Sequence, residues 1–122
     1  TRETAMARFK ALKAGENFHN LDPELKTTYS NADRTQNTIY MRLKYNEPSG
    51  TVVNVRKSMW IHPELDRAIS IREAARLQTF PDTFVFEGTK DSQYQQVGNA
   101  VPPFLARAIA ESVISILDKS AE

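Results

Sequence analysis

Apolar residues recur at helical spacing near both ends of the chain. Towards the N-terminus, Ala5, Phe9 and Leu12 are separated by four and three residues, which predicts a short amphipathic helix over residues 3–13. Towards the C-terminus the same spacing continues over a longer stretch, at Phe104, Leu105, Ala108, Ile109, Val113, Ile116 and Leu117. This second pattern predicts a long C-terminal amphipathic helix.

The middle of the chain shows the shorter period that is typical of strands. Residues 38–43 alternate between two faces, with Tyr40 and Arg42 opposite the apolar side chains. Residues 51–55 are β-branched at four of five positions, and a turn at residues 47–50 separates the two segments. The predicted fold class is therefore α+β: a small domain with a short antiparallel sheet and several helices, ending in the long amphipathic helix.

A second short helix is predicted near the N-terminus. Asp22 and Pro23 fit its N-cap and first helical position, and Leu25 and Tyr29 would give it an apolar face. The polar residues 30–37 that follow predict a mobile loop.

Two more helices are predicted in the C-terminal half. Ser70 and Glu73 have the spacing of a capping box, in which each side chain bonds the other residue's free backbone N–H. The helix that they begin ends before Pro81. Residues 91–97 predict another short helix, which Gly98 would end.

Composition excludes several classes of chemistry. The 122 residues fit one small domain or part of a larger one, and the net charge of +1 neither requires nor excludes nucleic acid as a partner. Without cysteine the chain has no disulfide, no thiolate metal ligand and no cysteine nucleophile. His62 has no second histidine or acid at ligand spacing, so no metal site is expected. No apolar run of membrane-spanning length is present, and a cytoplasmic location is expected.

The segment 93–103 has the most distinctive chemistry. Gly98 permits a positive φ or a close approach of another group, and Asn99 adds a side-chain donor and acceptor. Pro103 suits the first position of the helix that follows. A turn of this kind at a helix N-terminus suits a small polar or anionic ligand. A joint between two helices, without any ligand, explains the same residues.

Two segments resemble one family. Residues 72–82, Arg-Glu-Ala-Ala-Arg-Leu-Gln-Thr-Phe-Pro-Asp, resemble the ninth conserved motif of the DNA (cytosine-5) methyltransferases. Residues 96–103, Gln-Val-Gly-Asn-Ala-Val-Pro-Pro, resemble their tenth motif, and the interval between the two is similar. The resemblance covers residues 38–119 well and residues 1–37 weakly.

The resemblance implies a division of labour along the chain. Residues 1–69 would be part of a target recognition domain, and residues 70–122 a helical segment that returns to the catalytic domain of a larger S-adenosylmethionine-dependent methyltransferase fold. Asn99 would bind S-adenosylmethionine, and the backbone of Ala100 and Val101 would line its site.

The recognition side would contact duplex DNA through hydroxyl and basic side chains. Such groups position a duplex by its phosphates without reading the bases. The residues implied are Thr51, Arg56, Lys57 and Arg67. Ordinary solvated surface residues are the alternative for each of them.

Motif nine implies structural organisers rather than catalytic groups. Arg72, Glu73, Arg76 and Gln78 would tie the recognition and catalytic domains together through buried hydrogen bonds and ion pairs. An unpaired charge left in such a place costs several kcal/mol, so Arg76→Ala is expected to impair folding more than DNA contact.

The family's nucleophilic cysteine and its glycine-rich cofactor motif do not occur in this sequence. A covalent mechanism cannot proceed without its nucleophile, so no residue is assigned as catalytic and the chain alone is expected to be inactive.

It would be the C-terminal part of a methyltransferase, as a piece of a longer chain or as a subunit of a split enzyme. The alternatives are a DNA-binding or assembly subunit and a degenerate fragment. The catalytic domain would be its partner, in cis or as a separate subunit, and a homodimer through the exposed apolar last helix is the other expected association.

Overall fold

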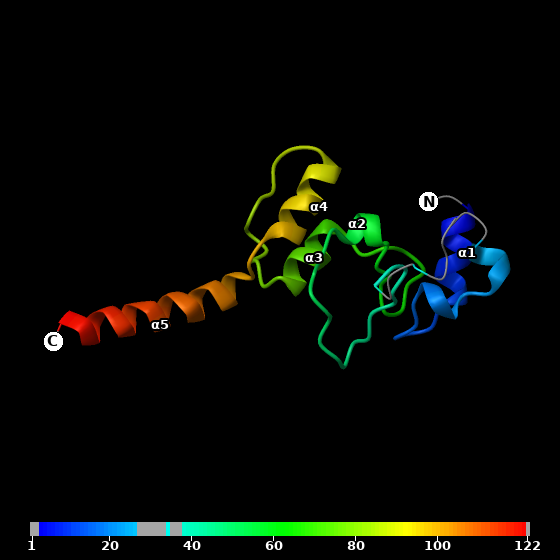
Figure 1. Ribbon diagram of the computed structural model, residues 1–122. Coiled ribbons are helices and arrows are strands. Elements are labelled where there is room, and N and C mark those ends of the chain that lie inside the picture. Colours follow the sequence, from blue (N-terminus) through cyan, green and yellow to red (C-terminus); the bar gives the residue numbers. More distant parts are fainter. Residues whose placement is uncertain (1–2, 27–33, 35–37, 122) are drawn as a thin grey trace.

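The computed structural model describes residues 3–26, residue 34 and residues 38–121. Within them the backbone forms five α-helices and two short 3-10 helices. In chain order they are α1 (Glu3–Ala11), η1 (Phe18–Asn20), η2 (Pro23–Lys26), α2 (Val55–Ser58), α3 (Ile71–Leu77), α4 (Lys90–Asn99) and α5 (Pro103–Ala121). Helix α1 lies at one end of the molecule, α2, α3 and α4 lie together in the middle, and α5 projects away from the other end (Figure 1).

The antiparallel sheet predicted from the sequence is wrong. The described residues contain only two isolated β-bridges, a parallel one between Arg42 and Ile61 and an antiparallel one between Ile61 and Ala68. Residues 38–40 form a turn in which Tyr40 has a φ of 52°. The chain is extended over residues 51–54 but pairs with no strand there, and the next residue begins α2. Contacts other than a β-ladder therefore hold these extended segments in place.

The second predicted strand, residues 51–55, packs against helix α4. The backbone of Val53 and Asn54 lies so close to Gly98 that an added Cβ would be 2.7 Å from the Val53 carbonyl carbon. Val52 and Val55 are buried in the core instead of facing a neighbouring strand. The β-branched residues of this segment therefore report burial, at Val52 and Val55, and they do not report strand pairing.

Two buried clusters form the core. One joins α2, α3 and α4, with Val55, Trp60, Ala74, Ala75 and Val97 among its most buried members. The other joins α1 to the segments around Phe18, Tyr40 and Ile61 and is composed of Phe9, Leu12, Phe18, Leu21, Tyr40 and Ile61. Because Trp60 and Ile61 are adjacent and fully buried in different clusters, this extended dipeptide links the two. The predicted division of the chain into residues 1–69 and 70–122 stays a prediction. The first cluster contains residues from both parts.

Most of the predicted helices are confirmed. Helix α1 begins as expected, and Ser70 and Glu73 form the reciprocal capping box at the start of α3. The predicted helix at Pro23 is a single 3-10 turn, η2. Tyr29 and the predicted loop at residues 30–37 lie outside the described residues, apart from Arg34. Gly98 does not end its helix, because α4 continues through it to Asn99.

Helix α5 is the predicted long helix, and no described part of it is buried. Its apolar side chains are between 49% and 70% exposed. By length and composition a helix within Lys90–Ser120 could cross a membrane, with none of the window buried. Charged residues are costly in a membrane interior, and α5 contains Arg107, Glu111, Asp118 and Lys119. An apolar face on a charged helix instead fits a protein surface that covers it.

Candidate functional site

The candidate ligand turn joins α4 to α5. Asn99 is the last residue of α4, Ala100 is its C-cap, and α5 begins at Pro103. Asn99 and Val101 are exposed, and Ala100 is half-buried. The structure therefore brings the three predicted cofactor residues to one accessible turn between two helices.

The buried side chain of Gln78 fixes this turn. It is the C-cap of α3, only 4% exposed, and its amide nitrogen donates to the carbonyl oxygens of Val97 (2.9 Å) and Ala100 (3.1 Å). The last carbonyl oxygens of a helix have no following helical N–H groups to bond, and the Gln78 amide donates to two such oxygens here. The Val97 oxygen also accepts from the backbone N–H of Ala100 (3.3 Å). The side chain thus fixes the end of α4 and the first residue of the turn.

Thr79 holds the other side of the turn. Its hydroxyl oxygen accepts a hydrogen bond from the backbone N–H of Phe104 (3.1 Å), in the first turn of α5. Thr79 has a φ of 65°, a conformation that is rare for a β-branched residue. Gln78 and Thr79 are consecutive residues of the segment 72–82, so this segment positions both helices that meet at the turn.

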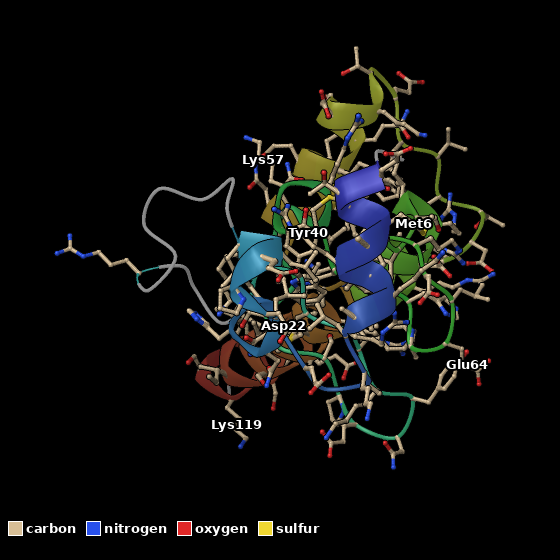
Figure 2. The ribbon with its side chains drawn as sticks, turned by 90° about the vertical axis from the view of Figure 1, so that its right-hand side faces the viewer. Met6, Asp22, Tyr40, Lys57, Glu64 and Lys119 are labelled. Carbon is tan, nitrogen blue, oxygen red and sulfur yellow. The ribbon has the colours of Figure 1, made fainter. Side chains whose placement is uncertain are left out.

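The four predicted DNA contacts fall into two groups. Arg56 pairs with Asp91 of α4 (2.9 Å), and Arg67 forms a bidentate pair with Glu73. Thr51 and Lys57 are exposed, and Figure 2 shows Lys57 at the outer edge of the molecule. Arg56 and Lys57 share the short helix α2, whereas Thr51 and Arg67 lie in separate connecting segments.

The other predicted organising residues of the segment 72–82 differ from the sequence prediction in one respect. Arg72 donates to the carbonyl oxygens of Pro81 and Phe84, which is an organising role. Arg76, however, is exposed and pairs with Asp82 at the surface. The prediction that Arg76→Ala leaves a buried unpaired charge is wrong for this chain, because exposed ion pairs contribute only about 0–1 kcal/mol.

Sequence reasoning missed two residues with structural roles: Arg42, which joins α1 to the segment before α3, and Thr79, which contacts the start of α5. Arg42 was placed on the outer face of a strand, but its side chain is buried and bonds to several backbone carbonyl oxygens. Thr79 was given no role. A basic residue inside an apolar run was the available signal for Arg42, while nothing in the local sequence distinguishes Thr79.

Glu73 has the most strongly shifted acid–base equilibrium among the described residues. Two N–H groups of Arg67 donate to its carboxylate at 2.7 and 3.0 Å, and the backbone N–H of Ser70 donates at 2.7 Å. The hydrogen bonds from Arg67, and then that from Ser70, hold the pKa of Glu73 at about 2, below its ordinary 4.5, although desolvation opposes them. Glu73 therefore stays ionised in the folded chain.

We expect the pair of Arg67 and Glu73 to make the free energy of unfolding depend on pH in the acid range. Because the folded pKa of Glu73 is the lower one, its contribution is fully present above about pH 4.5 and is lost as pH falls towards about 2. Urea unfolding of Glu73→Gln should consequently change less between pH 5 and pH 2 than that of the wild type. Asp82→Asn, which removes a carboxylate from an exposed pair, is the comparison and should change the slope less. Equal slopes for wild type and Glu73→Gln would contradict this account.

Comparison with known proteins gives a consistent family. A family model described as C-5 cytosine-specific DNA methylase matches residues 3–115. The Type II methyltransferase M.AgeI of Thalassovita gelatinovora is 51% identical over 77 residues, which cover 61% of this chain and 18% of that protein. M.DdeI of Desulfomicrobium norvegicum is 37% identical over 119 residues, covering 87% of this chain and 29% of that protein. The chain thus spans less than a third of the length of these relatives.

One relative is of comparable size. The Type II methyltransferase M.AquIB of Picosynechococcus sp. is 44% identical over 95 residues, and these cover 69% of this chain and 68% of that protein. M.AquIB is accordingly much shorter than M.AgeI, of which 77 residues make up only 18%.

Proposed function

Since the chain belongs to the C-5 cytosine-specific DNA methylase family, we propose that it forms the C-terminal part of a DNA cytosine-5 methyltransferase. The observation that carries the proposal is the contact of Gln78 with the turn at residues 99–101. This contact joins the two segments that resemble conserved motifs, and it leaves the turn accessible.

The proposed ligand of this turn is S-adenosylmethionine. Asn99 would hydrogen-bond its amino-acid end, and the backbone at Ala100 and Val101 would line the site. S-adenosylmethionine supplies the methyl group when it is bound. The exposure of the turn supports this assignment, because the rest of the site would come from the catalytic part.

Duplex DNA is the proposed substrate, and α2 is the element best placed to touch it. Lys57 is an exposed cation, and Thr51 offers an exposed hydroxyl; both can bind phosphate. Arg56 and Arg67 have carboxylate partners, which DNA phosphates would have to replace. We therefore assign Thr51 and Lys57 the larger share of the contact. The proposed location of the reaction is the cytoplasm, where bacterial DNA lies.

Catalysis requires a second part of the protein. The chain has no cysteine, and cytosine C5 becomes reactive only after a nucleophile adds at C6. The catalytic part would therefore supply the nucleophile and most of the cofactor site. It would also cover the apolar face of α5, which the described residues leave exposed. A homodimer through α5 is the alternative cover.

A separate subunit is the second candidate organisation. The short relative M.AquIB favours it, because this relative matches the same region and yet is a small protein. In this organisation the chain contributes DNA contacts and the cofactor turn to another polypeptide. The chemistry proposed for each residue is unchanged.

Reconstitution with the catalytic part, in one polypeptide or in two, tests the proposal. We expect tritium transfer from labelled S-adenosylmethionine to cytosine C5 of duplex DNA only when both parts are present, together with one-to-one sedimentation. The isolated chain should transfer none. Transfer by the isolated chain, or full activity of the catalytic part without it, would contradict the proposal. A stable homodimer that excludes the catalytic part would contradict the assigned role of α5.

A further inference from the structure

We propose that Asn54 and Gln95 are positioning residues that turn the side-chain amide of Asn99 so that its N–H donors face the cofactor's carboxylate. This inference rests on the proposed function, because it assumes that Asn99 binds S-adenosylmethionine. It adds which end of the Asn99 amide is presented, what fixes it, and which group of the cofactor it selects.

The orientation starts at a backbone group. The N–H of Lys57 donates to Oδ1 of Asn54, the N-cap of α2, at 3.3 Å. A backbone N–H can only donate, so the acceptor end of the Asn54 amide must face it. The nitrogen of Asn54 then points the other way and donates to Oε1 of Gln95 in α4 at 2.9 Å.

The same reasoning carries the orientation to the turn. Because Oε1 of Gln95 is occupied as an acceptor, its nitrogen is the free end, and this nitrogen donates to Oδ1 of Asn99 at 2.9 Å. Gln95 and Asn99 are four residues apart on one helix, where side chains are neighbours. Each amide thus fixes which way the next one faces, from Lys57 to Asn99.

The oxygen of the last amide, that of Asn99, accepts from Gln95, and among the described residues its nitrogen has no hydrogen-bond acceptor. The amino-acid end of S-adenosylmethionine carries a carboxylate, which only accepts hydrogen bonds, and an ammonium, which only donates them. The available N–H groups of Asn99 suit the carboxylate. With the Asn99 amide reversed, its oxygen would face the carboxylate and repel it. The orientation therefore selects between the two ends of one ligand group.

The two sides of this chain of amides are held at a fixed separation. Gly98 lies against the backbone of Val53 and Asn54, which keeps Asn54 beside α4. Arg56 of α2 also pairs with Asp91 of α4. The contact between Asn54 and Gln95 is therefore supported on both sides by independent contacts.

Gln95→Glu tests the inference in the methyltransferase, meaning this chain together with its catalytic part. A carboxylate at residue 95 can only accept, so Asn99 would turn its nitrogen towards residue 95 and its oxygen towards the cofactor. We expect the dissociation constant of S-adenosylmethionine, measured by calorimetry without DNA, to rise about tenfold or more. Its decarboxylated analogue, which lacks the accepting group, should bind as to the wild type.

Two further variants separate orientation from charge and from folding. Gln95→Met is neutral and removes the donor, and it should weaken S-adenosylmethionine but not the analogue, by a smaller factor of about threefold. Gln96→Glu adds the same charge one residue away, where the native amide bonds to Glu87 and Ser92 instead. It should leave the ratio of the two dissociation constants unchanged.

Each outcome has one meaning. The inference would be overturned if the ratio of the two dissociation constants were the wild-type ratio in both Gln95→Glu and Gln95→Met. Equal weakening of both ligands is one such result, and it would assign Gln95 a structural role only. A shift in Gln96→Glu as large as in Gln95→Glu would show that charge alone is responsible and would also overturn it. Failure of the wild-type methyltransferase to bind S-adenosylmethionine would instead overturn the proposed function, and the inference with it.

Discussion

Arg42→Met is expected to lower the free energy of unfolding by about 3–5 kcal/mol, because it removes the shared donor of several buried acceptors. The guanidinium is nearly inaccessible, with 4% of the residue exposed. Its nitrogens donate to the carbonyl oxygens of Leu12, His62, Leu65 and Phe9 and to the carboxylate of Asp66. Methionine fills much of the same space, but it leaves these acceptors without a donor.

The acceptors belong to parts of the chain that lie far apart in the sequence. Phe9 lies within α1 and Leu12 directly follows it, whereas His62, Leu65 and Asp66 belong to the segment before α3. Two isolated β-bridges are the only ladder-type contacts among the described residues. The side chain of Arg42 therefore connects backbone segments that a β-sheet would connect in other folds. Loss of Arg42 should accordingly separate α1 from the rest of the fold.

Denaturant unfolding followed by circular dichroism measures the effect. Arg42→Lys should recover less than half of the loss, because an ammonium cannot span the five acceptors that the planar guanidinium reaches. Arg107→Met is the matched control, since Arg107 forms an exposed pair with Glu111 on α5 and should cost less than about 1 kcal/mol. A loss below 1 kcal/mol for Arg42→Met, or full recovery by lysine, would remove Arg42 from this role.

Helices were predictable from the sequence where their signal is local. The apolar spacing of α1 and α5 and the capping box of α3 depend on residues within one or two turns of each other. The sheet was wrong because alternation reports only which side chains are buried. Whether residues 51–54 meet a strand or the glycine of a helix more than forty residues away is a property of the tertiary fold.

The candidate site divides in the same way. Asn99, Ala100 and Val101 could be predicted as a group because their segment is contiguous. The bonds that position them come from Gln78, Gln95 and Asn54, and two of these three lie far away in sequence. Backbone carbonyl oxygens are present at every residue, so the sequence gives no sign of which of them Gln78 reaches. The apolar face of α5 was predictable from the sequence, and the structure leaves this face exposed.

Gly98→Ala is the second large effect, and its sign opposes the usual helix preference. Alanine in place of glycine inside a helix normally stabilises it by up to about 1 kcal/mol. Here the new Cβ would lie 2.7 Å from the carbonyl carbon of Val53, 2.8 Å from the nitrogen of Asn54 and 2.9 Å from the oxygen of Val53. All three are backbone atoms, which cannot swing aside as a side chain could. Helix α4 must therefore move away from residues 53–54, and we expect a net loss of about 1–3 kcal/mol.

The displacement of α4 should also reach the cofactor turn. Moving α4 from residues 53–54 breaks the bond between Asn54 and Gln95 and shifts Asn99 at the helix end, so Gly98→Ala should weaken S-adenosylmethionine binding as well as folding. Gly50→Ala is the matched control, because nothing lies within 4 Å of its new Cβ and its effect should be neutral or slightly stabilising. Denaturant unfolding of each variant chain, and calorimetry with S-adenosylmethionine on each variant together with the catalytic part, distinguish the outcomes. If Gly98→Ala were as stable as Gly50→Ala and bound the cofactor normally, close packing at Gly98 would play no part in forming the site.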